Sequence, residues 1–491
     1  MRLPAAISVL VSCALLATVD AGAATGRLLA VSYASPAALR AATEGRARVV
    51  RVYPRIHVAQ IRVARAGAAA AIRAGAGIRY VEPVHTRVEA SEPALFSSPV
   101  VGTPYEWQYA AAHVDAVPES VLRAASAVTI AVIDTGADLT APDLAAKSPR
   151  THNLRTGRPD VEDVIGHGTF VSSLAAGSVT NDDGIAGFGG DAKLLVIKAS
   201  GPDGSFSDVD EANAIAYAVD HGARVINLSV GGTETSETER RGIAYATQRG
   251  VLIVAAIGNE YELGNPIEYP AALLQPVGSR GNGGVGLAVG ATAEDGERAF
   301  FSNTGSQLSL VAPGEHVFGA VASTAEPDSY PTVTLPGSTA GLYGFGTGTS
   351  FATPEVAGAA ALVMGANPLL RPTEVSQILK ATASNHGAWD PYTGYGSLDV
   401  GAAVARAQTH TLVSLSGTRV GRLIRLRWGT GGASTYRVSV RPAGKPPAVL
   451  LSRTTRTSAA FRLPRGPRYA FTVTAFDAAG TRLASASTIV R

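Results

Sequence analysis

The chain has 491 residues, too many for a single hydrophobic core, so we expect two to four domains. Hydrophobic residues make up 46% and charged residues only 16%, which excludes an intrinsically disordered chain. The net charge of +3 conceals three different balances. Residues 24–100 hold 11 Arg against 4 Glu (+7), residues 101–410 hold 16 basic against 33 acidic residues (−17), and residues 411–491 hold 14 basic residues against one acid (+13). These balances predict three separate domains.

The first 23 residues predict a signal peptide. Arg2 supplies a positive start, an apolar run extends from Leu3 to Val19, and Ala21-Gly22-Ala23 is a small-residue cleavage site. We therefore expect a secreted protein, extracellular or periplasmic. A lipoprotein anchor at Cys13 is the minor alternative. Cys13 is the only cysteine, so a chain cleaved after Ala23 would have no disulfide and no cysteine chemistry.

Residues 24–90 alternate strand-like and helix-like patterns. The expected strands are 28–33, 47–53, 57–63 and 78–83, and the expected helices are 36–43 and 66–74. This order, β-α-β-β-α-β, is typical of a ferredoxin-like domain. Ser and Pro are frequent in residues 91–104, which predicts an exposed linker.

Residues 105–408 carry short apolar runs separated by helical patterns such as 209–221 and 240–249. The runs are 128–133, 193–198, 225–229, 251–257 and 285–289. Strands that are apolar on both faces belong in a parallel sheet covered by helices. The fold class predicted for this segment is therefore α/β, with a doubly wound, mostly parallel sheet.

Residues 411–491 change to short alternating strands broken by Gly and Pro. The expected strands are 423–428, 435–441, 458–463 and 468–476. This spacing predicts a small C-terminal β-sandwich.

Three polar residues stand where catalytic groups collect in such folds. Asp134 directly follows the apolar run 128–133, at the carboxyl end of a predicted strand. His167 stands between two glycines at the start of an apolar helix, and Ser350 opens another helix after Gly348. Each alone has a structural interpretation: a turn residue for the Asp, a core histidine for the His, and a helix N-cap for the Ser.

Taken together, the order Asp, His, Ser is the one found in subtilisin. The chain resembles the subtilisin family over residues 105–408, and no Gly-x-Ser-x-Gly esterase elbow surrounds Ser350. The resemblance implies that Ser350 is the nucleophile, His167 its general base and Asp134 the residue that orients the imidazole. It also implies that Asn259, in the segment 255–259, stabilises the oxyanion with the Ser350 backbone N–H.

Two further segments resemble the substrate-binding strands of that family. They are Ser229, Val230 and Gly231 in one, and Ala256, Ile257 and Gly258 in the other. The chain departs from the family pattern at Phe351, where Met is usual, at Glu355, where His is usual, and at Ile257, where Ala is usual. None of these removes a catalytic group, and Ile257 is expected to alter the pocket for the residue before the scissile bond.

The implied chemistry requires no metal and no organic cofactor. Asp182-Asp183 and the acids from Asp203 to Asp210 could offer oxygen ligands to a structural calcium ion, with solvated turns as the alternative. The run from Glu234 to Glu239 predicts a polar loop. We assign no metal site.

The flanking domains have distinct expected roles. Residues 24–90 resemble the family's propeptide, and their +7 charge would favour association with the −17 segment as an intramolecular inhibitor. An independent binding module is the alternative. Residues 411–491 resemble a fibronectin type III domain, with Trp428 as the buried strand-B residue, although a generic sandwich remains open. Its charge predicts binding to polyanions or an anionic cell surface, with docking on the acidic domain as the alternative.

The sequence therefore predicts a secreted serine endopeptidase that hydrolyses protein or peptide substrates through an acyl-enzyme intermediate. Two hypotheses remain beside it. One is a pseudoprotease that binds without turnover, and the other is a sedolisin-type acid peptidase, which would not need His167 between glycines.

Overall fold

The computed structural model describes residues 26–65, 67–88, 105–181, 184–325, 330–333, 342–409, 414–429, 433–464, 468–476, 480 and 482–490. The predicted signal peptide (1–23), the predicted linker (91–104) and Asp182-Asp183 lie outside the described residues. The chain divides into two compact units, Met1–Val84 and His85–Arg491. Within the described ranges, no helix has both the length and the apolar composition needed to cross a bilayer.

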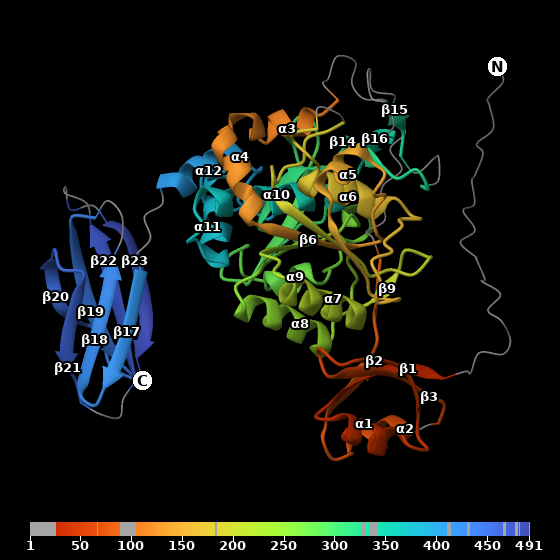
Figure 1. The fold of residues 1–491 in the computed structure, drawn as a ribbon, viewed down its shortest axis with the longest axis horizontal. Helices are drawn as coiled ribbons and strands as arrows, with labels where there is room; N and C mark the ends of the chain where they lie inside the picture. Colours follow the sequence, from red (N-terminus) through yellow and green to blue (C-terminus); the bar gives the residue numbers. More distant parts are fainter. Residues whose placement is uncertain are drawn as a thin grey trace, which may run out of the picture. The chain divides into compact units, whose positions relative to one another are not determined.

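The first unit is a four-stranded antiparallel sheet with two helices on one face (Figure 1). Its elements are β1 (Arg27–Tyr33), α1 (Pro36–Thr43), β2 (Arg48–Tyr53), β3 (Val58–Val63), α2 (Ala68–Arg73) and β4 (Ile78–Pro83). The strand order β2-β3-β1-β4 is that of a ferredoxin-like domain, as predicted. Val31, Ile61 and Ile72 are fully buried between sheet and helices.

A seven-stranded parallel sheet forms the centre of the second unit, in the order β13-β12-β11-β10-β6-β8-β7. The strands are β6 (Thr129–Asp134), β7 (Arg150–Asn153), β8 (Lys193–Lys198), β10 (Val225–Leu228), β11 (Leu252–Ala256), β12 (Leu287–Thr292) and β13 (Leu310–Pro313). The chain builds outward on both sides of β6, so the carboxyl end of β6 is the switch point where such folds bind ligands. The doubly wound α/β prediction is confirmed.

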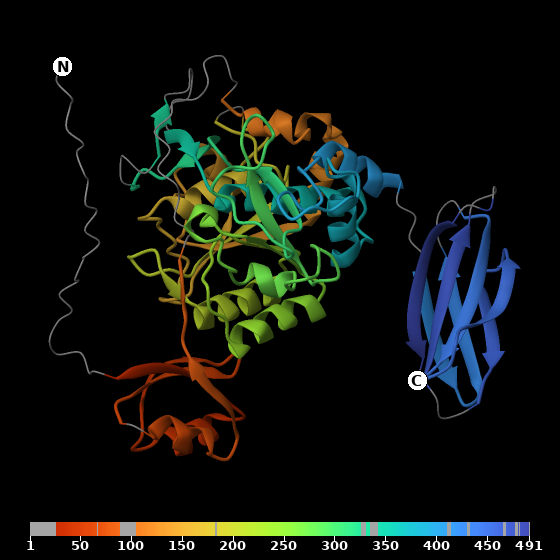
Figure 2. The ribbon, with the colours of Figure 1, turned by 180° about the vertical axis from the view of Figure 1, so that it is seen from behind.

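Helices cover both faces of this sheet (Figures 1 and 2). Alternate residues of β6 enter different cores, because successive side chains of a strand point to opposite faces. Ile130 and Val132 pack in the core with α6 (His167–Ala176) and α10 (Thr349–Ala366). Ile133 packs in the core with α7 (Asp208–Asp220) and α8 (Glu237–Gln248).

Shorter elements complete this part of the unit. The helices are α3 (Trp107–Ala111), α4 (Glu119–Ala124), α5 (Pro142–Lys147), α9 (Ala271–Leu274), α11 (Pro372–Thr382) and α12 (Val400–Thr409), with 3-10 turns at Val114–Ala116, Ala125–Ala127 and Tyr261–Leu263. A small antiparallel sheet has the order β14-β16-β15, from β14 (Val317–Val321), β15 (Thr332–Val333) and β16 (Leu342–Gly346). A two-stranded sheet pairs β5 (Thr86–Arg87) with β9 (Phe206–Ser207).

The C-terminal residues form two antiparallel sheets, β17-β18-β21 and β20-β19-β22-β23. The strands are β17 (Ser414–Val420), β18 (Leu423–Gly429), β19 (Thr435–Pro442), β20 (Ala448–Thr454), β21 (Ser458–Arg462), β22 (Tyr469–Phe476) and β23 (Arg482–Val490). One core joins the two sheets and includes Trp428, Val438 and Phe471. This is the predicted sandwich, with β17, β20 and β23 in addition to the four expected strands.

Candidate active site

Asp134 and His167 meet at the switch point of the central sheet. Asp134 ends β6, His167 begins α6, and the His167 Nδ1 atom lies 2.8 Å from Asp134 Oδ1, with both side chains fully buried. A carboxylate only accepts, so Nδ1 carries the proton and Nε2 is the nitrogen able to take one up. The close approach requires glycine after the histidine: a Cβ on Gly168 would lie 2.3 Å from the Gly136 carbonyl oxygen.

A buried carboxylate that the sequence analysis missed holds this turn in place. Asp163 Oδ2 accepts hydrogen bonds from the Thr169 amide and hydroxyl at 2.8 and 2.6 Å. Its Oδ1 accepts from the Gly166 amide at 2.9 Å and from the Thr135 hydroxyl at 2.8 Å. Asp163 thereby satisfies amide groups at the start of α6 and links that helix to the residue after Asp134. An acid just before an apolar helix was the available sequence signal.

Ser350 lies in the first turn of α10, which packs against α6. The rings of Phe351 and Phe170 are 4.5 Å apart, and the rings of Phe351 and His167 are 5.7 Å apart. Phe351, one of the residues that depart from the family pattern, thus brings the segment of Ser350 against the imidazole. Ser350 Oγ donates to the Ser229 carbonyl at 3.2 Å, and Ser229 Oγ donates to the Ser350 carbonyl at 2.7 Å.

Asn259 is oriented by the same helix terminus. Its Oδ1 accepts hydrogen bonds from the Thr349 amide at 2.9 Å and from the Thr349 hydroxyl at 2.8 Å. Because Oδ1 is fixed as the acceptor, the Nδ2 donor lies on the other side of the amide group. A fixed side-chain donor beside the amides at a helix N-terminus is suited to stabilise an anion formed near Ser350.

The two predicted substrate segments follow neighbouring parallel strands. Ser229, Val230 and Gly231 follow β10, while Ala256 ends β11 and Ile257 and Gly258 come next, so both segments lie at the same edge of the sheet. The Ile257 side chain is only 1% exposed and packs with Leu308 and Val311. Contrary to the expectation from sequence, this side chain lies in the core instead of lining a pocket.

A carboxyl pair lies against these segments and was also missed. A Cβ on Gly231 would lie 2.3 Å from Glu268 Oε2, and a Cβ on Gly258 would lie 2.8 Å from Glu268 Cδ. Burial, together with a hydrogen bond to Glu260 and its negative charge, raises the pKa of Glu268 to about 9. Nothing in the local sequence signals this residue, because only the fold brings it between the two segments.

The segment before the predicted linker enters the same region. Thr86 and Arg87 of β5 pair antiparallel with β9, and Val88 forms an antiparallel bridge with Gly231. The Gly231 amide donates to the Val88 carbonyl at 2.9 Å, and the Val88 amide donates to the Gly231 carbonyl at 3.3 Å. Residues 85–88 therefore run as an extended strand along one of the two predicted substrate segments.

The acids proposed as calcium ligands are used in protein hydrogen bonds where they are described. Asp203 accepts from Ser205 Oγ at 2.8 Å, Asp208 Oδ1 accepts from the His85 amide at 3.1 Å, and Asp210 forms a capping box with Ser207. Among the described residues, no group of three or more His, Cys, Asp or Glu side chains is arranged to hold a metal ion.

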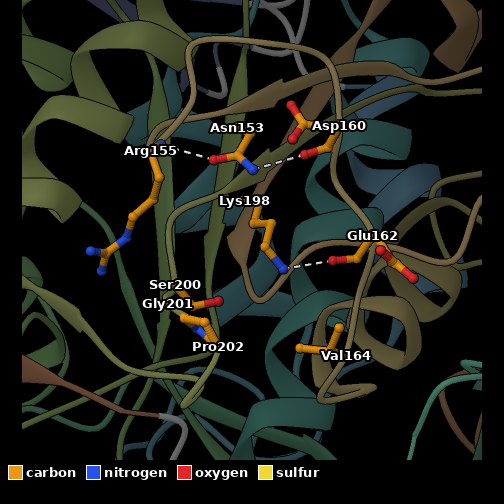
Figure 3. A pocket seen from close by; sticks show the side chains of 9 residues that line it. All are labelled: Asn153, Arg155, Asp160, Glu162, Val164, Lys198, Ser200, Gly201 and Pro202. Atoms are coloured by element: carbon orange, nitrogen blue, oxygen red, sulfur yellow. Dashed lines mark hydrogen bonds between the residues drawn. The ribbon is translucent and has the colours of Figure 1, made fainter.

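A cavity of about 320 Å³ lies at the ends of β7 and β8, where Asn153 and Lys198 line it (Figure 3). Lys198, which pairs with Asp134 across β6 and β8, donates from Nζ to the Thr135 carbonyl at 2.8 Å and to the Glu162 carbonyl at 2.6 Å. Burial lowers the pKa of Lys198. The ammonium thus ties the residue after Asp134 to the loop that leads into His167.

Comparisons with known proteins agree with this geometry. Residues 125–396 match the model of the subtilase family. Subtilisin Savinase of Lederbergia lenta is 37% identical over 278 residues, which cover 57% of this chain and 91% of the relative. A thermophilic serine proteinase of Bacillus sp. (strain AK1) is 34% identical over 281 residues, covering 57% of this chain and 62% of that protein.

The fold has a counterpart among solved structures. Fervidolysin from Fervidobacterium pennivorans, described as a keratinolytic enzyme related to subtilisin, superposes with a TM-score of 0.65 over 96% of this chain and 77% of its own. The two sequences are 23% identical, so this likeness concerns the fold.

Proposed function

The chain belongs to the subtilase family and is a serine endopeptidase, and on that premise we propose that Asp134, His167 and Ser350 are its catalytic triad. The observation that supports this most directly is the 2.8 Å contact between the buried Asp134 carboxylate and His167 Nδ1, which leaves Nε2 as the base. The packing of Phe351 against the imidazole supports Ser350 as its partner.

In the proposed mechanism, Ser350 Oγ attacks the peptide carbonyl while His167 Nε2 removes its proton. Asp134 keeps the imidazole in the productive tautomer and stabilises the imidazolium that forms. Asn259 Nδ2 and the Ser350 backbone N–H donate to the oxyanion. His167 then protonates the leaving amine, and water hydrolyses the acyl-enzyme by the reverse sequence of proton transfers.

The same proposal covers the flanking features. Residues 24–90 act as an intramolecular inhibitor that the enzyme cleaves, and the bridge between Val88 and Gly231 supports that role. Residues 1–23 direct export of the protein and are removed in that process. The reaction uses only side chains and amides of this chain, so we expect activity in EDTA, while loss of thermal stability in EDTA would indicate structural calcium.

The decisive experiment is fluorophosphonate labelling of the purified protein at neutral pH, with peptide mapping of the adduct. We expect the label on Ser350, and we expect Ser350→Ala to abolish both labelling and hydrolysis of casein, by ~10⁶-fold if it follows subtilisin itself. Labelling without turnover would favour the pseudoprotease. Activity confined to acidic pH would favour the sedolisin-type mechanism, because a histidine base must be unprotonated to act.

Maturation gives an independent test. The purified Ser350→Ala precursor should remain at full length, whereas the unchanged precursor should process itself at a rate independent of protein concentration. Processing of the purified Ser350→Ala precursor would show that another protease removes residues 24–90.

A further inference from the structure

The side chain of Arg87 is buried in an acidic pocket of the second unit. Its Nε donates to Glu211 Oε2 at 2.9 Å, and its Nη2 lies 2.8 Å from Glu239 Oε1. All three side chains have no exposed surface. The pocket is built by two helices, because Glu211 belongs to α7 and Glu239 to α8.

The region of Glu239 differs from its sequence prediction. Residues 234–239 were expected to form a polar loop, but α8 begins at Glu237, after Ser236 as its N-cap. The Glu239 amide donates to Ser236 Oγ at 3.1 Å. The helix start turns Glu239 inward, and the same side chain accepts from Thr235 Oγ1 at 2.6 Å.

Two carboxylates buried side by side are costly unless a cation accompanies them. Burial and the neighbouring Glu239 raise the pKa of Glu211, while Arg87 opposes that rise. Asp208 adds to the negative charge and accepts the His85 amide, which fixes the backbone of the segment that carries Arg87. The pocket is thus constructed around a guanidinium that arrives on an extended strand.

We propose that Glu211 and Glu239 form a specificity pocket that selects an arginine in the substrate, four residues before the bond that is cleaved. This inference rests on the proposed endopeptidase function and deepens it. Arg87 shows how such a side chain binds, since the strand that carries it pairs with the predicted substrate segment at Gly231.

The position of the arginine follows from the antiparallel register. Val88 lies opposite Gly231, so a substrate chain that continues this register has its second following residue opposite Ser229. Ser350 Oγ donates to the carbonyl of Ser229 at 3.2 Å. The substrate residue opposite Ser229 therefore lies beside Ser350, and the peptide bond that follows this substrate residue is the one presented to the Ser350 hydroxyl. Counting back from this bond, the residue equivalent to Arg87 is the fourth.

The geometry favours arginine over lysine. The guanidinium reaches Glu211 through Nε and Glu239 through Nη2, so one planar group satisfies carboxylates from two helices. An ammonium group is a compact point charge without this fork. A leucine would leave both carboxylates buried and uncompensated.

The test uses the mature enzyme and peptides of the form acetyl-X-Val-Glu-Ala-p-nitroanilide, in which X is Arg, Lys or Leu. We expect kcat/KM for X = Arg to exceed that for X = Leu by about 100-fold, with Lys between them. Equal values for Arg and Leu would overturn the pocket while leaving the endopeptidase function intact. Failure to hydrolyse all three peptides and casein would overturn the proposed function, and the inference with it.

Variants assign the preference to the two glutamates. Glu211→Gln and Glu239→Gln keep the side-chain shape, and each should reduce the Arg to Leu ratio about tenfold, with the double variant reducing it further. Glu237→Gln is the matched control, since Glu237 lies on the same helix but is exposed and pairs with Arg241. A ratio that is unchanged in the double variant, or reduced equally in the control, would overturn the assignment.

The precursor supplies a test that needs no variant. The register predicts that self-processing first cuts between Ala90 and Ser91, so that Arg87 is the fourth residue before the cleaved bond. Intact-mass analysis at early times should therefore show a product beginning at Ser91. A first product with another N-terminus would overturn the register.

Discussion

Two regions of the second unit each bring a buried carboxyl group close to a second one, and the two regions differ in how the charge is compensated. Between α7 and α8, Glu211 and Glu239 share the guanidinium of Arg87. On α10, five residues after Ser350, Glu355 is equally buried, but the charge that acts on it is another carboxyl group, that of Glu106. Within the described part of the chain, neither oxygen of Glu355 has a hydrogen-bond partner.

The difference shows when a buried acid implies a ligand. Burial, reinforced by Glu106, raises the pKa of Glu355 well above its usual value. Burial also raises the pKa of Glu106, to about 8, although its Oε1 accepts the Ala186 amide. This pair can therefore exist as neutral acids at neutral pH, whereas the pair between α7 and α8 meets a cation that the chain itself supplies. Glu355 and Glu106 are therefore a structural feature, whereas Glu211 and Glu239 form the proposed binding pocket.

The largest expected effect concerns another buried carboxylate, Asp134, whose partner His167 is the proposed catalytic base. Asp134→Asn should lower kcat by about 10⁴, because an amide can hold His167 in the wrong tautomer. The measurement is steady-state hydrolysis of a peptide anilide by matured enzyme. Asp115→Asn, at an exposed position, is the control. A loss below tenfold would mean that the pairing with His167 is structural only.

The next largest effect is expected when Arg87 is replaced, because Glu211 and Glu239 then lose their cation, as Glu355 and Glu106 have none. In a Ser350→Ala precursor, which stays intact, Arg87→Leu should weaken the docking of residues 85–88 by about 3 kcal/mol, the cost of breaking a buried ion pair. The Val88 amide should then exchange its hydrogen about 100-fold faster. Thr86→Val, at an exposed neighbouring residue, should leave that rate nearly unchanged, and equal acceleration in both variants would contradict the prediction.

The contrast between these regions also explains what sequence could predict. Asp134, His167 and Ser350 stand in contiguous patterns, an apolar run before the first and glycines around the others, so their order and their resemblance to the subtilisin family could be recognised in the sequence. The Arg87 pocket draws on positions 87, 211 and 239, which only the tertiary fold brings together. One local signal existed: Ser236 and Glu239 have the spacing of a capping box, which predicts a helix start where polar composition suggested a loop.

The sequence analysis missed the strands β7 and β20, because neither carries a clear apolar pattern. The central strands of the parallel sheet are uniformly apolar, and their positions were predicted to within a few residues. The edge strand β7 has the sequence Arg-Thr-His-Asn and is only partly buried, so it lacks the apolar run that marks its neighbours. In the sandwich, β20 has no fully buried residue, and its pattern gave no clear alternation.

A smaller effect is expected for Glu355, whose contribution to the free energy of unfolding should depend on pH. Because the folded-state pKa of Glu355 is raised, the native state holds a proton that the unfolded state loses as pH rises above about 4.5. Above that pH, stability should fall by up to about 1.4 kcal/mol per pH unit until the folded-state pKa is reached. Glu355→Gln should remove this contribution, so the variant should be more stable than the unchanged chain at alkaline pH and similar near pH 4.

Thermal unfolding of the Ser350→Ala chain, measured from pH 4 to pH 9, is the appropriate experiment for Glu355. Glu237→Gln, an exposed substitution, should leave the pH profile unchanged. A Glu355→Gln variant that is less stable at every pH would show that the carboxyl group makes a specific contact that the core depends on.

The smallest effect on stability is expected where the charges are exposed, on the C-terminal sandwich. Arg425 and Arg427 alternate with buried residues of β18, and Arg437 and Arg441 alternate with buried residues of β19, so the pairs lie on the outer faces of two different sheets. Replacing either pair with Gln should change stability by less than about 0.5 kcal/mol. If the +13 charge serves to bind polyanions, each double variant of the Ser350→Ala chain should nevertheless elute from heparin at lower salt, because exposed charges act through a screened field. A larger shift for one pair would identify the binding face. No retention of the unchanged chain even at low ionic strength would exclude polyanion binding and favour docking of the sandwich on an acidic surface of the same chain.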